Sequence, residues 1–423
     1  MPYDPESVRS FFPALAQTDD GKPRIYFDNP AGTQVPTMVA ERMRDCLLES
    51  NANLGGGFAT SDRADAVVAD AHDAMADMLN APSSDEIIFG QNMTTLTLEM
   101  SRAIGRTLKA GDEIVVTRMD HDANIYPWLL IARDLGLEVR WLDFDTELYE
   151  FDLAKLDTLL GEKTKLVCVA GASNLLGTLN DIREISRRAR AVGAWTFVDA
   201  VQSTPHVATD VQSIGCDFLA CSAYKFFGPH QGILWGRQDI LASLEAYKLR
   251  AASDSLPSKF ETGTQSHEGM AGTAAAVDYF AMIGETMAVD EQANYPSFDG
   301  RRKAVHAAMD CLFDYEKSLA SALIEGLETL PGVRVRGVTA PDAMDRRVPT
   351  VAFTHDRLHP DEIAQALSER NIFVWSGHNY AVEVVKLLGL EDSGGVVRVG
   401  PVHYNTRSEI DTLIDALGEI LAH

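Results

Sequence analysis

Short apolar runs alternate with amphipathic stretches between about residue 25 and residue 235. Four of the runs predict buried strands: residues 113–117, 137–142, 165–170 and 195–198. Three stretches carry apolar side chains at helical spacing: residues 64–79, 128–135 and 182–192. Continuous apolar strands separated by helices indicate an α/β fold, with a mostly parallel sheet covered on both faces. Ligands of such sheets bind beyond the carboxyl ends of the strands, so we expect the functional residues at these ends.

The pattern changes after about residue 290. A long helix is predicted over 301–330, and shorter elements follow it: strands at 333–335, 350–353, 372–375 and 396–399, and helices at 361–369 and 408–421. This mixture indicates a smaller α+β domain. We therefore expect an N-terminal arm over 1–24, a large domain over 25–290 and a small domain over 291–423.

The charge of the chain restricts its partners. With 37 basic and 62 acidic residues the net charge is −25, which argues against nucleic acid and anionic membranes as partners, because both need a basic surface. No apolar run approaches the roughly 18 residues of a membrane helix. Residues 1–17 show neither a basic start nor an apolar core, so we expect no signal peptide.

The five cysteines are odd in number and scattered, and most lie in apolar stretches. A disulfide framework or a metal site is therefore not expected, and a reducing cytoplasm is the predicted location. We expect a small-molecule substrate.

Two predicted strands end in residues with chemical potential. The segment TFVDAVQ brings Asp199 and Gln202 to one strand end, and CDFLACSAYKFFG brings Ser222 and Lys225 to another. Either segment alone is common, since aspartate caps turns and lysine lies on surfaces. Together they match pyridoxal phosphate (PLP), which needs a lysine for a Schiff base and an acid to keep its pyridine nitrogen protonated. Desolvation at the sheet edge would lower the lysine pKa and activate the amine.

Other residues suit the same cofactor. Thr94 and Thr95 precede the apolar-periodic stretch 96–104 and so lie at a helix N-terminus, which binds anions such as phosphate. His121 follows a strand and a turn, where it could stack on the pyridine ring. Asn174 follows the strand 165–170 and could donate to the phenolate oxygen of PLP or to substrate. Taken singly, these residues are equally compatible with a helix cap, a polar loop and a turn.

Seven segments in order resemble the class V aminotransferases, particularly the cysteine desulfurases and selenocysteine lyases. They are YFDNPAGTQVP from Tyr26, the pair Thr94-Thr95, DHDANIYPW from Asp120, ASNLLGT from Ala172, VDAVQ…SAYKFFGP through Pro229, FETGTQ from Phe260 and RVGPVHYNT from Arg398. The resemblance covers nearly the whole chain. It implies a fold type I PLP-dependent homodimer with active sites at the subunit interface.

The resemblance also implies roles for individual residues. Lys225 is then the Schiff-base lysine and the Cα base, with Asp199 at the pyridine nitrogen and His121 on the ring. The remaining implied contacts are Gln202 to the phenolate oxygen, Thr94, Thr95 and Ser222 to the phosphate, Gly263 and Thr264 to the phosphate of the partner subunit, Arg398 to the substrate α-carboxylate, and Ala31, Asn174, Trp375 and Tyr380 to the substrate.

The chain departs from the desulfurases on the substrate side. Their nucleophilic cysteine lies on a loop that resembles residues 375–380, WSGHNY, which holds no cysteine. Tyr380 falls at or beside that position, and Trp375 stands where an arginine is common. Tyr224 replaces a frequent histidine, and Gly55-Gly56 occupies the region of a His-Arg pair.

We therefore predict a PLP-dependent enzyme acting on a small L-amino acid, a C–S lyase or a related lyase or transferase without a persulfide cysteine. Amino transfer and epimerisation are alternatives, because both also begin with proton abstraction from Cα. The rival from another class is an inactive PLP-binding or interaction protein. The retention of Lys225, Asp199, Gln202 and Arg398 argues against it.

Overall fold

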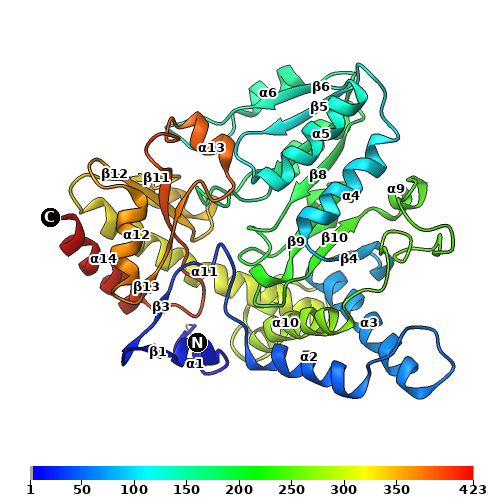
Figure 1. Ribbon diagram of the computed structural model, residues 1–423, viewed down its shortest axis with the longest axis horizontal. Helices are drawn as coiled ribbons and strands as arrows, with labels where there is room; N and C mark the ends of the chain where they lie inside the picture. Colours follow the sequence, from blue (N-terminus) through cyan, green and yellow to red (C-terminus); the bar gives the residue numbers. More distant parts are fainter. Residues whose placement is uncertain (1–2, 423) are drawn as a thin grey trace.

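The computed structural model describes residues 3–422 and is built around a seven-stranded sheet (Figure 1). Strand β10 runs antiparallel to both of its neighbours, and all other neighbouring strands are parallel. In spatial order the strands are β4 (Ile87–Gly90), β10 (Gly232–Gly236), β9 (Phe218–Ser222), β8 (Trp195–Asp199), β7 (Thr164–Ala170), β5 (Glu113–Thr117) and β6 (Glu138–Leu142). The predicted mostly parallel sheet is confirmed.

Alternation along each strand divides the large domain into two cores. On β7, for example, Val167 and Val169 join one apolar cluster, whereas Leu166 and Cys168 join the other. Helices α3 (Ala59–Met78), α7 (Ile182–Ala191) and α10 (His267–Thr286) contribute to the first cluster, and α4 (Met93–Gly105) and α5 (Tyr126–Leu135) to the second. Both faces are buried, which explains why the strands read as continuous apolar runs.

Local signals set the ends of α5. The helix begins two residues before the predicted 128, because Pro127 fits the first turn, where no backbone N–H is needed. It ends at Leu135, and Gly136 closes it with a left-handed φ of 70°.

The small domain contains a four-stranded antiparallel sheet, seen beside the large sheet in Figure 1. Its strands are β11 (Val333–Arg336), β12 (Val351–His355), β15 (Val396–Val399) and β14 (Trp375–Gly377), and its helices are α12 (Pro360–Ser368), α13 (Val382–Leu387) and α14 (Arg407–Leu421). The long helix α11 (Gly300–Glu328) contributes Val305 and Leu312 to the large-domain core but Leu319 and Leu323 to the small-domain core. One rigid helix thus joins the two parts, and the boundary near residue 290 stays a prediction.

The single strand expected over 372–375 is wrong. Strand β13 (Ile372–Phe373) pairs with β3 (Ile25–Tyr26), whereas β14 pairs with β15. The run divides at Val374 because its two halves hydrogen-bond to different sheets, a choice that local hydrophobicity does not reveal.

The N-terminal residues pack against the rest of the chain, since Val8 and Phe12 are fully buried in the large-domain core. The remaining elements are α1 (Glu6–Arg9), β1 (Thr18–Asp19), β2 (Lys22–Pro23), α2 (Thr37–Glu49), α6 (Leu153–Leu159), α8 (Val211–Ile214), α9 (Gln238–Ser243) and the 3-10 turns η1 (Pro13–Ala16), η2 (Ser84–Glu86), η3 (Asp122–Asn124), η4 (Ala223–Lys225), η5 (Glu291–Asn294) and η6 (Pro341–Arg346). Within the described range 3–422, no helix combines the length and apolar character needed to cross a membrane.

Candidate active site

The carboxyl ends of three parallel strands open into a cavity of about 820 Å³ between the large and small sheets. Strand β7 ends at Ala170, β8 at Asp199 and β9 at Ser222, and the register places Asp199 beside both Ala170 and Ala220. Lys225 follows on the turn η4. The predicted residues that line the cavity are Ala31, Thr94, His121, Asn174, Asp199, Gln202, Ser222, Lys225, Trp375, Tyr380 and Arg398.

Lys225 is buried and held by the backbone. Its Nζ donates a hydrogen bond to the carbonyl oxygen of Pro30, far away in sequence. Burial, reinforced by the positive charge of Arg398, lowers the pKa of Lys225 to about 7, although Asp28 and Asp199 oppose the shift. A substantial share of its amine is therefore neutral, and nucleophilic, near pH 7.

Asp199 faces the cavity from the end of β8. Burial raises its pKa to about 6, although the Val201 backbone N–H donates to Oδ1 over 2.9 Å and Lys225 lies nearby. A cation bound against this carboxylate would hold it ionised, because an opposite charge at close range favours the charged form.

A second buried carboxyl group, that of Asp120, interacts electrostatically with Asp199 and was not singled out from the sequence. Asp120 accepts hydrogen bonds from the Thr117 hydroxyl, from Asn124 Nδ2 at 2.6 Å and from the Ala170 backbone N–H at 3.0 Å. Burial raises its pKa to about 8. These contacts tie the residue before His121 to the end of β7, so they position the histidine over the cavity.

His121 contributes a neutral aromatic ring to the lining of the cavity. Burial lowers its pKa to about 4, with contributions from the charges of Lys225 and Arg398. Its Nδ1 accepts from the Ala123 backbone N–H over 3.0 Å, which leaves the proton on Nε2 in the neutral ring. The Tyr380 ring stacks on it, with centroids 5.3 Å apart and planes 25° apart.

Two buried polar atoms of residues that line the cavity have no hydrogen-bond partner within residues 3–422. Arg398, on β15, donates through Nη1 to the Asn174 carbonyl oxygen over 3.1 Å and lies 3.4 Å from Asp28 Oδ1 through Nη2, but its Nε is unpaired. Asn174 donates through Nδ2 to the Asn379 carbonyl oxygen over 2.7 Å, and its Oδ1 is unpaired. Because such atoms cost about 1–3 kcal/mol when left unpaired, both favour a bound ligand with an acceptor and a donor.

Asn174 has both a donor and an acceptor available. The bond to Asn379 uses one of the two protons on Nδ2, so the expected donation to a ligand stays a prediction, and the unsatisfied atom is the acceptor oxygen. This atom suits an N–H donor on a ligand.

The predicted phosphate end is at the start of α4. Asn92 caps this helix, and its Oδ1 accepts from both the N–H and the hydroxyl of Thr95 at 2.9 Å. Thr94 and Asn92 line the cavity, whereas Thr95 does not. Gly263 and Thr264 are exposed in the segment before α10 and also lie outside the cavity of this chain. Their expected contact with a partner subunit stays a prediction.

The segment 375–380 covers the opposite side. The backbone N–H of Asp122 donates to the Tyr380 carbonyl oxygen over 2.8 Å, which ties this loop to the His121 segment. Asn379 and Tyr380 take left-handed φ values of 48° and 57° to make the turn. Gln202 closes the floor, where its Nε2 donates to Thr350 Oγ1 over 2.8 Å. No cysteine lines the cavity in the described part of the chain.

These residues fit PLP on structural grounds. An activated amine, a carboxylate that a cation would keep ionised, and a capped helix N-terminus surround one cavity. Within residues 3–422, no group of three or more histidine, cysteine or acidic side chains is arranged to hold a metal ion.

The family model for "Aminotransferase class-V" matches residues 25–295 and 305–413. The chain belongs to this family. It is a PLP-dependent enzyme of the class V, cysteine desulfurase-like group, with the fold type I architecture.

Relatives named as a probable cysteine desulfurase and as an aminotransferase-like protein match nearly the whole chain. A probable cysteine desulfurase of Streptomyces coelicolor is 32% identical over 436 residues, covering 99% of this chain and 97% of that protein. The aminotransferase-like protein FGM3 of Gibberella zeae is 35% identical over 425 residues, covering 98% of each. The solved apo structure of a cysteine desulfurase from Thermococcus onnurineus NA1 superposes with a TM-score of 0.87, at 28% identity and 100% coverage of both chains.

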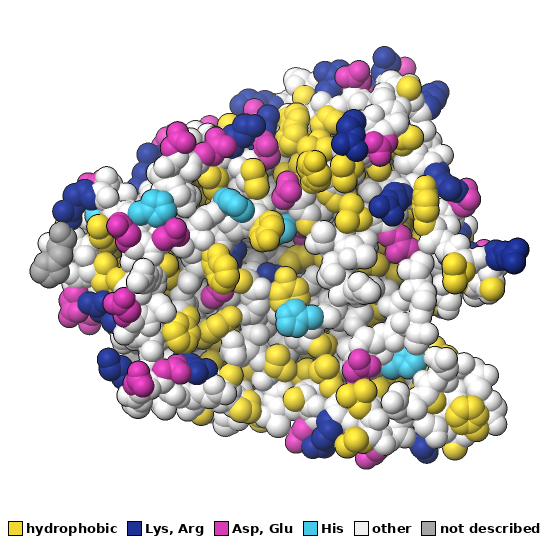
Figure 2. All heavy atoms as spheres, in the orientation of Figure 1, with side chains coloured by type: hydrophobic (Ala, Val, Ile, Leu, Met, Phe, Trp, Pro, Cys, Tyr) yellow, Lys and Arg dark blue, Asp and Glu magenta, His cyan; other side chains and the backbone are white. Residues whose placement is uncertain are grey.

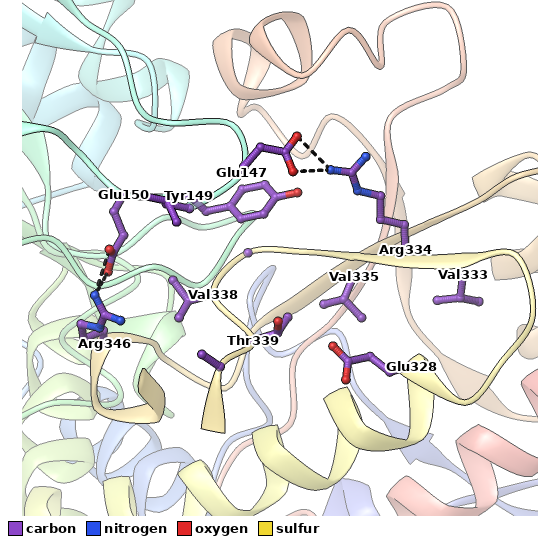
Figure 3. A pocket seen from close by; sticks show the side chains of 13 residues that line it. Glu147, Tyr149, Glu150, Glu328, Val333, Arg334, Val335, Val338, Thr339 and Arg346 are labelled. Carbon is purple, nitrogen blue, oxygen red and sulfur yellow. Dashed lines mark hydrogen bonds and ion pairs between the residues drawn. The ribbon is translucent and has the colours of Figure 1, made fainter. Parts of the chain in front are cut away.

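A second cavity, of about 420 Å³, differs from the first because its charged side chains form exposed ion pairs. Figure 3 shows it between residues 147–150 and strand β11, with Glu147 paired to Arg334 and Glu150 to Arg346. Both arginine side chains are more than half exposed. None of the residues singled out from the sequence lines this cavity.

Proposed function

We propose that this class V enzyme removes the Cα proton of an L-amino acid and completes its reaction without a persulfide cysteine. The observation that carries the proposal is the buried amine of Lys225, whose pKa lies near neutrality in the same cavity as the unpaired Arg398 Nε. When bound, PLP supplies an electron sink that stabilises negative charge at Cα.

The residues of the chain then have separate tasks. Lys225 accepts the Cα proton, which requires the neutral amine that its lowered pKa provides. Asp199 keeps a proton on the ring nitrogen of the cofactor through charge pairing, and neutral His121 covers the ring. Arg398 binds the α-carboxylate, and the Asn174 Oδ1 accepts from an N–H of the substrate.

The surroundings of the cysteines support a route that uses no thiolate. All five are buried, and burial raises the pKa of each thiol, to about 12 for Cys221 and about 11 for Cys311. Neutral thiols are poor nucleophiles. The loop residues Tyr380 and His378 line the cavity instead and are candidates for the second proton transfer. We therefore favour elimination by a lyase, with C–S cleavage when the β-substituent is sulfur.

Amino transfer is the second candidate. The 35% identity to a protein named as aminotransferase-like supports it. The first half of the chemistry is shared, because both routes begin with the proton that Lys225 removes.

We also propose that two chains form a homodimer. Gly263 and Thr264 are exposed and lie outside the cavity of their own chain, which suits a contact with the phosphate site of a partner.

The test follows the Cα proton and the products together. PLP-loaded protein in deuterated buffer should exchange the Cα hydrogen of its amino-acid substrate, as read by NMR. Keto acid and ammonia without an acceptor indicate elimination, whereas dependence on an added keto acid indicates amino transfer. Lys225→Ala should abolish the exchange. Alanine and sulfide released from cysteine in the presence of an added thiol reductant would contradict the persulfide-free route.

A further inference from the structure

The lining of the active-site cavity has two chemically different parts. One part is charged and deeply buried, around Lys225, Asp199 and Arg398. The other part is a wall of apolar side chains from two adjacent helices and the turn before α5: Met93 and Leu98 from α4, Ala123 from η3, and Tyr126, Pro127 and Leu130 from α5. The proposed roles of the charged residues do not use this wall.

The packing of α5 directs two of these side chains toward the cavity. Trp128, Ile131 and Ala132 are buried in the core beneath the helix. Tyr126 and Leu130 are four residues apart, so they share a different face of the helix and both line the cavity. Tyr126 remains 52% exposed, and Figure 2 shows hydrophobic side chains gathered on the surface over the α5 region. An apolar surface at the mouth of a ligand cavity gains free energy when a ligand covers it.

Charge at this cavity restricts the ligand further. Among the described residues that line it, Lys225 and Arg398 are the only lysine and arginine. Lys225 is used for proton transfer and Arg398 for the α-carboxylate, so neither is left to pair with an acidic group on the substrate side chain. Asp122 adds negative charge near His378 at the same wall. A side-chain carboxylate would be repelled there.

We propose that the substrate is an L-amino acid with a large, uncharged side chain that packs on Leu98, Tyr126 and Leu130. For elimination this side chain is a thioether, whose sulfur leaves from Cβ as a thiol, and for amino transfer it is an aliphatic or aromatic group. This rests on the proposed function, because Lys225 and Arg398 must orient the amino acid. Each methylene buried on the wall adds about fourfold in affinity. The side chain of alanine covers little of the wall and gains correspondingly little.

The experiment measures binding through the absorption band of the cofactor. PLP-loaded protein is titrated with L-alanine, L-aspartate, L-leucine and L-phenylalanine, and a Kd is taken from the initial spectral change. Leucine and phenylalanine should bind at least about tenfold more tightly than alanine, and aspartate most weakly. Leu130→Lys should weaken leucine binding about tenfold or more and strengthen aspartate binding, because it places a cation on the wall.

Leu135→Lys is the matched control. Leu135 lies on the same helix, is 38% exposed and does not line the cavity, so the same added charge should leave the order of affinities unchanged. Equal affinities for alanine and phenylalanine, or equal effects of the two lysine variants, would overturn the inference and leave the proposed function standing. A Leu130→Lys protein whose assembly changes while its Kd values do not would also overturn it, since the wall would then be covered by a second chain. If no amino acid changes the spectrum, the result contradicts both the proposed function and this inference.

Discussion

Charged side chains line both the active-site cavity and the cavity of Figure 3, but of these two only the active-site cavity removes them from water. Lys225, Asp199 and Arg398 are each less than a tenth exposed, and their pKa values move accordingly. In the cavity of Figure 3, Glu147 and Arg334 form an ion pair at 3.1 Å with both side chains more than half exposed. Exposed pairs of this kind contribute about 0–1 kcal/mol. Charge alone therefore does not mark a reactive site; charge combined with burial does.

The largest expected effect comes from removing the activated amine. Lys225→Ala should eliminate the cofactor absorption band and reduce turnover by at least about a thousandfold, since the residue serves as both anchor and base. Lys259→Ala is the control, because Lys259 is also buried but donates to the carbonyl oxygens of Leu241 and Ala242, away from the cavity. Absorbance and steady-state assays distinguish them. Full turnover by Lys225→Ala would refute the assignment.

Substitution of Arg398 should have an intermediate effect on substrate binding, whereas the same substitution of Arg334 should have almost none. Arg398→Lys is expected to raise the Kd of the amino-acid substrate about 10- to 100-fold, because an ammonium cannot reproduce the bidentate guanidinium geometry. Arg334→Lys in the second cavity should leave this Kd unchanged and alter the free energy of unfolding by less than about 1 kcal/mol. Spectral titration and chemical denaturation provide the measurements. Similar changes in both variants would remove the distinction between the cavities.

The smallest effect concerns pH. Because burial lowers the pKa of Lys225 to about 7, its neutral fraction rises with pH and is nearly complete by pH 8. The rate at which PLP attaches to the apoprotein should rise about tenfold between pH 6 and pH 8 and then level off. A lysine with an ordinary pKa would rise about a hundredfold over the same interval without a plateau. Stopped-flow absorbance separates the two profiles, and continued growth beyond pH 8 would contradict the lowered pKa.

Much of the fold was predictable because it depends on local patterns. The runs 113–117, 165–170 and 195–198 became strands of the large sheet, since both faces of each strand are buried. The single strand expected over 372–375 is wrong, because its pairing does not depend on the local pattern. Its halves belong to different sheets, and their partners, β3 and β15, are remote in sequence.

Some residues of the candidate site could be predicted from the sequence, and others could not. Asp199 and Ser222 were predictable because each ends an apolar strand, and parallel neighbours bring such ends to one edge. Asp28 was missed as a neighbour of Arg398, because its contact comes from a bridge between Asp28 and Gly400, two positions far apart in the chain. The apolar wall was also missed, since a helix pattern does not say which solvent-facing side chains border a cavity.

The sequence by itself determined the α/β class, the class V resemblance and the residues able to carry PLP chemistry, because strand ends and motif order are local properties. Only the tertiary structure decided how those residues are tuned. It placed Lys225 against the Pro30 carbonyl oxygen and near Arg398, Tyr380 on His121, and Leu130 at the cavity mouth. Desolvation and charge pairing depend on neighbours hundreds of residues away, so packing sets the chemistry of this site.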